Sequence, residues 1–430
     1  MKNIIFFAIS FFVIFSCRET VTQKDTMPLQ EASPESVGMS TERLSRIDTM
    51  LNKAINDSEI PGAVVLVARN GKLVYHKAFG IADSEIGMPY RTEDIFRIAS
   101  QTKAITSTAV MMLWEEGKFR LDDPISKYIP EFESAQIIES FNEMDSSFTG
   151  KPLDKPITIR HLLTHTSGIG YGFIDSDLRF KKVFQKAGII DAFTTDSITT
   201  EDNIKALARM PLHHNPGERF TYSEGLDVLG YFVEIMSGMP FDDYLESKIF
   251  KPLGMKDTYF YLPESKYERL VPVLIKDGEN WKHYQAVGYD VNYPIKGAKT
   301  LFSGGAGLSS TVKDYALFLQ MYLNQGELGG KRLLSRTTVQ TIMANQIGDI
   351  WGENAGGYYG LAFRVIDKIG QDRGGQGSQG TFDFGGYFNT SYFADPKEGI
   401  IGIIYKQTQN LPVDNTSWKF RQLVFQAIAD

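Results

Sequence analysis

Residues 98–103 read Ile-Ala-Ser-Gln-Thr-Lys, and residues 104–114 continue as Ala-Ile-Thr-Ser-Thr-Ala-Val-Met-Met-Leu-Trp. The continuation is apolar almost all round, which is typical of a helix buried on every side. Ser100 and Lys103 stand three residues apart, so they lie on one face at the start of this helix. We therefore expect a central buried helix that brings a serine and a lysine side by side.

Ser100 and Lys103 have the chemistry of a nucleophile and its base. A hydroxyl is a weak nucleophile until a neighbouring group takes its proton. Burial disfavours the charged ammonium form of a lysine, and a helix start favours negative charge developing on a serine. The alternative is that Ser100 only caps the helix. The four-residue pattern by itself leaves both interpretations open.

The same pattern recurs at Ser310 and Lys313. There it opens a helix whose apolar residues are Tyr315, Leu317, Phe318, Leu319, Met321, Tyr322 and Leu323. Ser310 or Thr311 is better explained at that position as the N-cap of the helix. Other motifs must therefore decide whether Ser100 is catalytic.

Composition limits the class of protein. The chain has 430 residues and a formal net charge of −7, with acidic and basic residues interspersed. These values are typical of a globular protein with one large domain or two smaller ones. Basic patches are absent from the sequence, so we expect no nucleic-acid partner.

The N-terminal segment predicts export. Residues 1–16 combine a charged start with an apolar run of signal-peptide length. Cys17, the sole cysteine, follows this run in an order that resembles the lipobox of bacterial lipoproteins. That resemblance implies cleavage before Cys17, lipid on its thiol, and a periplasm-facing or outer-membrane location. We interpret residues 17–39 as a tether, and this anchor as the only membrane contact.

Hydrophobic patterns outline the remaining fold. Residues 41–55 have helical spacing, and residues 63–68 and 73–80 are β-rich runs around Asn70-Gly71, a hairpin signal. Strands are predicted at 358–366, 386–394 and 400–407, with a last helix at 418–429. This pattern predicts an α/β (α+β) fold with an antiparallel sheet flanked by helices. The sheet part is expected at about 40–113 and 301–430. A mostly helical insertion at about 114–300 has loop-like segments at 133–155 and 171–200.

Tyr222 is the candidate for a further proton-transfer group. A serine hydrolase must protonate its leaving group, and a tyrosine hydroxyl can do so. Tyr222 stands in a polar turn before a helix whose apolar residues are Leu226, Leu229, Phe232, Val233 and Met236. An ordinary packed aromatic residue is the alternative interpretation.

Four blocks together resemble a known family. They are Ser100-x-x-Lys103, Leu-Leu-Thr-His-Thr-Ser-Gly at 162–168, Pro216-Gly217 with Tyr222-Ser223, and Lys-Pro-Leu-Gly-Met-Lys-Asp-Thr at 251–258. Their order and spacing over residues 40–410 resemble the serine β-lactamase family of class C type. That family also includes penicillin-binding DD-peptidases and family VIII carboxylesterases. The resemblance implies a β-lactamase/transpeptidase-like fold over residues 40–430, with Ser100 as nucleophile and Lys103 and Tyr222 jointly as base.

Two departures bring the chain closest to the family VIII esterase branch. Glu224 stands where lactamases carry the asparagine that binds a substrate amide. Phe384-Gly385-Gly386 stands where lactamases carry a cation that receives the substrate carboxylate. The resemblance places Phe384, Gly385 and Gly386 at the substrate, together with Glu224, whose side chain either points away or adds a negative charge to the site. It also implies an oxyanion hole formed by the backbone N–H groups of Ser100 and Tyr387.

The histidines do not suggest a metal site. His161 and His165 have zinc-like spacing, but no glutamate follows His161 as a metalloprotease requires. His213 and His214 are adjacent, so a regular element cannot turn both toward one metal. We therefore predict no metal and no cofactor.

The sequence as a whole favours an exported serine hydrolase that cleaves a carboxylic ester through an acyl-enzyme on Ser100. One alternative is a β-lactamase or a D-amino-acid-specific peptidase, which would act on β-lactams or on peptidoglycan peptides. A second alternative is a non-catalytic penicillin-binding or sensor module, although intact Ser100, Lys103 and Tyr222 count against it.

Overall fold

The computed structural model describes residues 29–409 and 414–430. The predicted signal peptide, the predicted lipidation site Cys17 and residues 17–28 of the predicted tether lie outside the described residues. Within the described residues, no helix is both long enough and apolar enough to cross a membrane.

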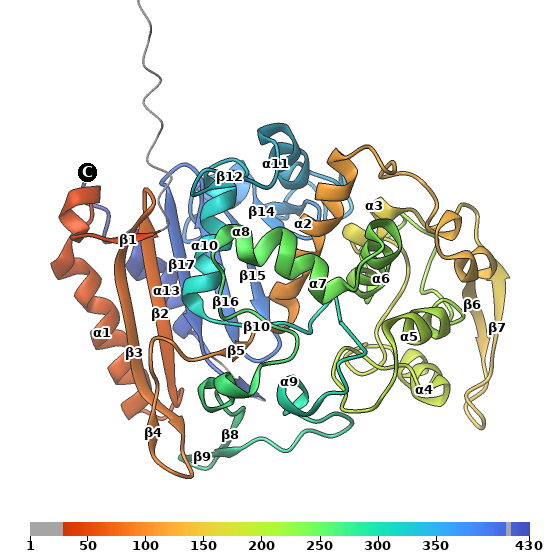
Figure 1. The fold of residues 1–430 in the computed structure, drawn as a ribbon, viewed down its shortest axis with the longest axis horizontal. Coiled ribbons are helices and arrows are strands. Elements are labelled where there is room, and N and C mark those ends of the chain that lie inside the picture. The colour runs from red at the N-terminus through yellow and green to blue at the C-terminus, as the bar shows by residue number, and fades with distance from the viewer. Residues whose placement is uncertain (1–28, 410–413) are drawn as a thin grey trace, which may run out of the picture.

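One large sheet joins the two ends of the described chain (Figure 1). Its strands follow the order β1 (Gln30–Glu31), β3 (Lys72–Asp83), β2 (Gly62–Arg69), β17 (Ile400–Tyr405), β16 (Thr390–Asp395), β15 (Phe382–Gly386), β14 (Arg364–Ile366) and β13 (Gly357–Tyr359). β1 runs parallel to β3, and every other pair along this order is antiparallel. The predicted antiparallel sheet is therefore confirmed.

The predicted hairpin at Asn70-Gly71 is also confirmed. β2 and β3 pair around this turn, where Asn70 and Gly71 have φ values of 51° and 75°. Positive φ at both central residues is what a type I′ hairpin turn requires, and Asn-Gly is the sequence that adopts it most readily. β2 also pairs with β17, so strands more than 300 residues apart in the chain form the centre of the sheet.

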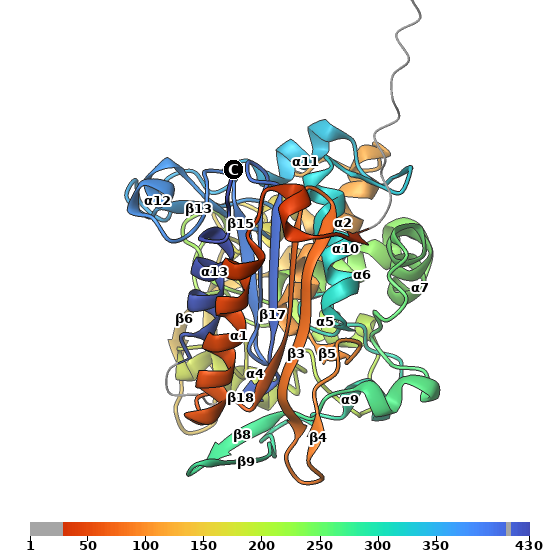
Figure 2. The same cartoon turned by 90° about the vertical axis from the view of Figure 1, so that its left-hand side faces the viewer.

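Helices cover both faces of the sheet. Figure 2 shows α1 (Thr41–Asn56) and α13 (Thr416–Phe425) side by side on one face, with α10 (Val312–Leu323) on the other. The predicted central helix is α2 (Thr102–Glu115), which is buried at every residue from Thr102 to Met111. It packs against α6 (Gly225–Ser237), so its first turn lies where the sheet part meets the region beside it.

Figure 1 shows a mainly helical region beside the sheet. It holds α3 (Ile159–Leu163), α4 (Leu178–Ala187), α5 (Thr200–Leu207) and α7 (Phe241–Leu245), with the strands β6 (Gln136–Phe141) and β7 (Phe148–Pro152). α8 (Lys251–Leu253) packs against α10, and α9 (Tyr293–Lys296) and the paired strands β8 (Leu274–Asp277) and β9 (Asn280–His283) lie toward the bottom of the view in Figure 1. Elsewhere lie β4 (Met88–Pro89), β5 (Phe96–Arg97), β10 (Ser309–Ser310), β11 (Glu327–Leu328), β12 (Lys331–Arg332), β18 (Thr408–Gln409), α11 (Arg336–Met343) and α12 (Lys368–Arg373).

Three segments differ from the predictions. Residues 133–155 form the β6–β7 hairpin, and residues 171–200 contain α4, although both segments were expected to be loops. Residues 358–366 form two strands instead of one, because the chain reverses near Ala362, whose φ is 66°. The strand expected at 386–394 is likewise broken by a turn at Asn389, whose φ is 67°.

Candidate active site

Ser100 lies in a strained turn at the start of α2. The turn is a short 3₁₀ segment, Ala99–Gln101, and Ala99 has a φ of 44°. A left-handed conformation is unfavourable for a residue with a side chain, so surrounding contacts must hold it. Tyr405 Oη donates to Gln101 Oε1 at 2.6 Å, and Tyr315 Oη donates to the Gln101 carbonyl at 2.9 Å. The turn is thereby fixed, with Ser100 partly exposed.

Lys103 is fully buried one turn after Ser100. Its Nζ donates to Tyr171 Oη at 3.0 Å and to the Gly305 carbonyl at 2.8 Å. The same Nζ lies 4.6 Å from the ring centroid of Tyr222. The structure therefore brings Lys103 and Tyr222 together at the turn that carries Ser100.

His165 holds the turn that carries Tyr222. Its Nδ1 accepts the backbone N–H of Ser223 at 3.1 Å, and its ring centroid lies 4.5 Å from that of Tyr222. Burial and the nearby Lys103 hold the pKa of His165 well below its ordinary value of 6.5. A neutral imidazole therefore supports the position of the Tyr222 ring.

The other histidines have structural contacts. His161 Nδ1 accepts the N–H of Thr158 at 3.1 Å and completes the N-terminal cap of α3. His213 contacts Asp175 at 2.9 Å, and His214 Nε2 lies 2.8 Å from the hydroxyl of Thr221. Among the described residues, no three His, Cys, Asp or Glu side chains are grouped so as to hold a metal ion.

Tyr171 is a site residue that the sequence analysis missed. Its hydroxyl accepts a hydrogen bond from Lys103, and its ring stacks on Tyr222 with centroids 5.6 Å apart. Burial raises the pKa of Tyr171 well above 10, so the hydroxyl keeps its proton. Tyr171 belongs to a segment of loop-like composition, and no spacing pattern links it to Lys103.

Asp227 is a buried acidic residue close to Lys103. Asp227 Oδ1 accepts the hydroxyl of Ser303 at 2.5 Å and the N–H of Gly305 at 3.1 Å. Asp227 thus positions the peptide unit of Gly305, whose carbonyl accepts from Lys103. No motif in the sequence marks either Asp227 or Gly305 as part of the site.

Glu224 does not lie where substrate contact was predicted. It is 1% exposed, and neither of its carboxylate oxygens has a hydrogen-bond partner among the described residues. Burial, followed by the nearby carboxylates of Asp191 and Asp227, raises its pKa well above 4.5. Glu224 therefore has no surface at which a substrate could touch it in this structure.

The end of β15 approaches the nucleophile turn closely. A Cβ added to Gly386 would lie 2.4 Å from the carbonyl oxygen of Ile98 and 2.2 Å from Thr390 Oγ1. Only glycine permits this approach. Tyr387 follows directly, and Tyr387 and Ser100 line the same cleft, as the predicted oxyanion hole requires. Gly385 differs from Gly386, because a Cβ there would meet only one atom, at 3.4 Å.

Phe384 contributes an aromatic ring to the site. The ring lies in a stacked arrangement with that of Tyr222, with centroids 6.3 Å apart and planes 27° from parallel. It also contacts the ring of Tyr359 in an edge arrangement at 6.4 Å. The β15 strand therefore places an apolar surface beside the candidate proton-transfer tyrosine.

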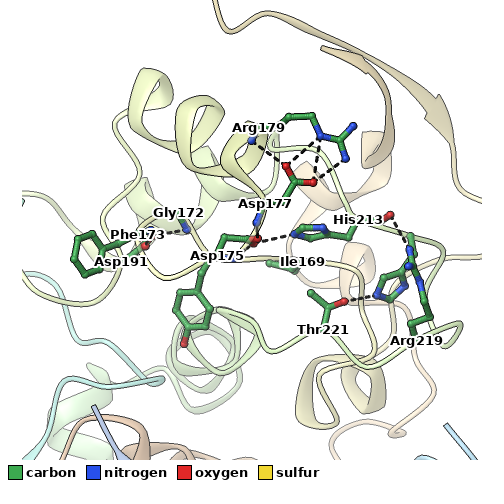
Figure 3. Close-up of polar contacts among 12 residues, drawn as sticks. Ile169, Gly172, Phe173, Asp175, Asp177, Arg179, Asp191, His213, Arg219 and Thr221 are labelled. Atoms are coloured by element: carbon green, nitrogen blue, oxygen red, sulfur yellow. Dashed lines mark hydrogen bonds and ion pairs between the residues drawn. The ribbon is translucent and has the colours of Figure 1, made fainter. Parts of the chain in front are cut away.

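A largely apolar cleft of about 570 Å³ opens beside Ser100. Its lining comes from Ser100, Tyr222, Ala306, Tyr387 and parts of the segments 171–174, 181–193 and 287–289. Asp191 holds one wall by accepting the backbone N–H groups of Gly172 and Phe173 (Figure 3). The cleft has room for a substrate of drug-like size.

The second Ser-x-x-Lys pattern has the expected structural role. Thr311 is the N-cap of α10, and its hydroxyl accepts the N–H of Asp314 at 3.1 Å. Lys313 is exposed, in contrast to the buried Lys103. The capping interpretation of this pattern is therefore confirmed.

The chain matches one family of known proteins. Residues 47–426 match the Beta-lactamase family. Esterase EstB of Burkholderia gladioli is 31% identical over 381 residues, which are 85% of this chain and 90% of EstB. Lovastatin esterase of Penicillium rubens is 28% identical over 392 residues, with 86% and 94% of the two chains covered. The solved structure of EstCE1, a hydrolase with promiscuous acyltransferase activity, superposes with a TM-score of 0.77 at 26% identity. The superposition covers 89% of this chain and 99% of EstCE1.

Proposed function

Because this chain belongs to the beta-lactamase family of serine hydrolases, we propose that it is a carboxylesterase that forms an acyl-enzyme on Ser100. The observation that carries this choice is Phe384, whose ring lies against Tyr222 where lactamases of this family carry a cation. Without that cation, a β-lactam or a D-amino-acid terminus loses the partner for its carboxylate. An uncharged ester has no such requirement. The names of the relatives EstB and lovastatin esterase support the same choice.

The proposed reaction begins when Ser100 attacks the ester carbonyl and its hydroxyl proton passes through Tyr222 to the neutral amine of Lys103. The backbone N–H groups of Ser100 and Tyr387 stabilise the oxyanion of the tetrahedral intermediate. Tyr222 then returns a proton to the departing alcohol. Water attacks the resulting acyl-enzyme, releases the carboxylic acid and restores Ser100.

Contacts around Lys103 support this division of roles. A neutral lysine amine has two N–H donors and one lone pair, and the Nζ of Lys103 donates to two acceptors, Tyr171 and Gly305. In the proposed mechanism the lone pair is therefore left to accept a hydroxyl proton from Ser100 or Tyr222. Both of these residues line the cleft, so a bound ester can reach them.

The alternative substrates are β-lactams and D-amino-acid peptides, which the family itself favours. Kinetics on the purified full chain separate the candidates, with p-nitrophenyl butyrate and a chromogenic cephalosporin measured side by side. We expect kcat/KM for the ester to exceed that for the cephalosporin by about 100-fold, which corresponds to roughly 2.7 kcal/mol of transition-state stabilisation. A higher kcat/KM for the cephalosporin would replace the esterase proposal by the alternative.

We also propose that the chain is exported and anchored through lipid on Cys17. The support is the sequence alone, a signal-like segment at 1–16 that ends at the sole cysteine. Metabolic labelling with a fatty acid, followed by cell fractionation, tests this location. The wild-type chain should carry label and sediment with membranes, and Cys17→Ser should do neither. Label on Cys17→Ser would refute the anchor.

A further inference from the structure

The cleft beside Ser100 exposes several large apolar side chains to solvent. Phe173 and Ile174 are each 44% exposed, and Val287 is 81% exposed. All three line the cleft together with Phe184, Ile189 and Phe193. Exposed apolar side chains grouped at a cavity indicate a ligand that buries them. A substrate that fills this cleft must therefore carry a sizeable apolar part.

Lys181, on α4, is a cation in this apolar cleft. Among the described residues, it has no ion pair within 4.0 Å and its Nζ makes no hydrogen bond. The other cations of α4 are all engaged with protein groups: Arg179 with Asp177 (Figure 3), Lys182 with Glu143, and Lys186 with the carbonyl of Asp145. The one cation of α4 that lines the cleft is thus also the one without a partner in the described part of the chain.

Asp191 is the other charged residue that lines the cleft, and its carboxylate is already hydrogen-bonded to the protein backbone. Both of its carboxylate oxygens accept backbone N–H groups, those of Gly172 and Phe173 (Figure 3). It lies beyond ion-pair distance of Lys181. An ammonium–carboxylate contact is stronger next to apolar surface than in water, so Lys181 would favour an anionic group of the substrate.

We propose that the natural substrate is an amphiphilic ester, with an apolar body in the cleft and a free carboxylate bound by Lys181. This inference rests on the proposed esterase function and names its substrate class. Lys181 belongs to α4 and lines the cleft, whereas Phe384 belongs to β15 and does not, so this carboxylate contact differs from the one that the cation of lactamases provides. Monoesters of long dicarboxylic acids have the required chemistry.

Matched esters test the proposal. The substrates are p-nitrophenyl monoesters of linear dicarboxylic acids of increasing length, each compared with its neutral methyl-ester counterpart. With the wild-type full chain, we expect kcat/KM at the best length to favour the carboxylate about tenfold, the worth of one charge-assisted hydrogen bond. Lys181→Met should bring this ratio close to one, and Lys181→Glu should invert it. High salt should weaken the wild-type preference.

Lys182→Met is the matched control, because Lys182 is the next residue on α4 and pairs with Glu143 outside the cleft. It should keep the wild-type ratio. A ratio that is the same in wild type and Lys181→Met, or a wild type without preference at any length, would overturn the inference while leaving the esterase proposal intact. Failure of the wild type to hydrolyse either ester would overturn both.

Discussion

The Nζ of Lys103 donates a 3.0 Å hydrogen bond to the hydroxyl of Tyr171, a residue 68 positions later in the chain. Tyr171 also stacks on Tyr222, so one side chain contacts both candidate proton-transfer groups. The arrangement indicates that Tyr171 positions Lys103 and Tyr222 without reacting itself.

Tyr171→Phe should lower kcat/KM for p-nitrophenyl butyrate by about 10- to 100-fold. The reason is the loss of one hydrogen bond to Lys103, which becomes charged as it takes the serine proton, and a bond to a charged group is worth roughly 1.5–3 kcal/mol. Because the ring remains, KM should change little. Tyr231→Phe serves as the control, since Tyr231 does not line the cleft. Equal activities of the two variants would show that Tyr171 has no positioning role.

Phe384→Lys should shift the substrate preference toward β-lactams. It introduces a cation on the strand where lactamases of this family have one, beside Tyr222. We expect kcat/KM for a chromogenic cephalosporin to rise relative to that for the ester. Ester turnover should fall, because the stacking contact, worth about 0.5–1.5 kcal/mol, is lost. An unchanged ratio of the two kcat/KM values would contradict the role given to Phe384.

Gly386→Ala should reduce both stability and turnover. The added methyl group would lie within 2.4 Å of the Ile98 carbonyl oxygen, and overpacking of this kind costs about 1–3 kcal/mol. It would also push Tyr387 away from Ser100 and distort the proposed oxyanion hole. Gly385→Ala is the matched control, with its nearest contact at 3.4 Å. Thermal unfolding and ester kinetics of both variants measure the two effects. Equal losses of stability and turnover in Gly386→Ala and Gly385→Ala would contradict the role given to Gly386.

Glu224→Gln should change how stability depends on pH. Burial raises the pKa of Glu224 well above 4.5, so the folded protein keeps this proton at pH values where the unfolded chain has lost it. The free energy of unfolding of the wild type therefore falls as pH rises above about 4.5. A glutamine side chain does not titrate, so the variant lacks this pH-dependent loss. Its free energy of unfolding should therefore rise relative to that of the wild type between about pH 5 and pH 8. Urea unfolding at both pH values measures the difference.

The exposed residue Glu133 provides the control for Glu224. Glu133→Gln should show the pH dependence of the wild type. If Glu224→Gln and Glu133→Gln have the same pH dependence of unfolding, Glu224 is not held protonated in the folded chain.

Local patterns were sufficient to predict the sheet, its Asn70-Gly71 hairpin and the buried helix after Ser100. Each depends on residues close together in the chain, where periodicity and turn chemistry act directly. The family resemblance supplied the role of Tyr222 and the β15 strand, and the structure places Tyr222 beside Lys103 and Phe384 of β15 beside Tyr222. The roles proposed for these residues remain predictions.

What the sequence did not reveal depends on contacts between distant segments. Tyr171 contacts Lys103 only because the chain folds back, and no spacing rule encodes that contact. The reversal near Ala362 divides an apolar run into two strands, and Gly360, the one turn residue in that run, was not enough to predict it. Glu224 has an ordinary acidic side chain in the sequence, and only the packing around it shows that it is buried.

The most direct test of the esterase proposal is the detection of the acyl-enzyme. The purified full chain is mixed with a slowly hydrolysed nitrophenyl ester, quenched with acid within the first turnovers, and studied by intact-protein and peptide mass spectrometry. We predict one added acyl group, located on Ser100, absent from Ser100→Ala, with turnover by that variant reduced about 10³-fold or more. Acyl label on another residue such as Ser310, or turnover by Ser100→Ala close to that of the wild type, would contradict it.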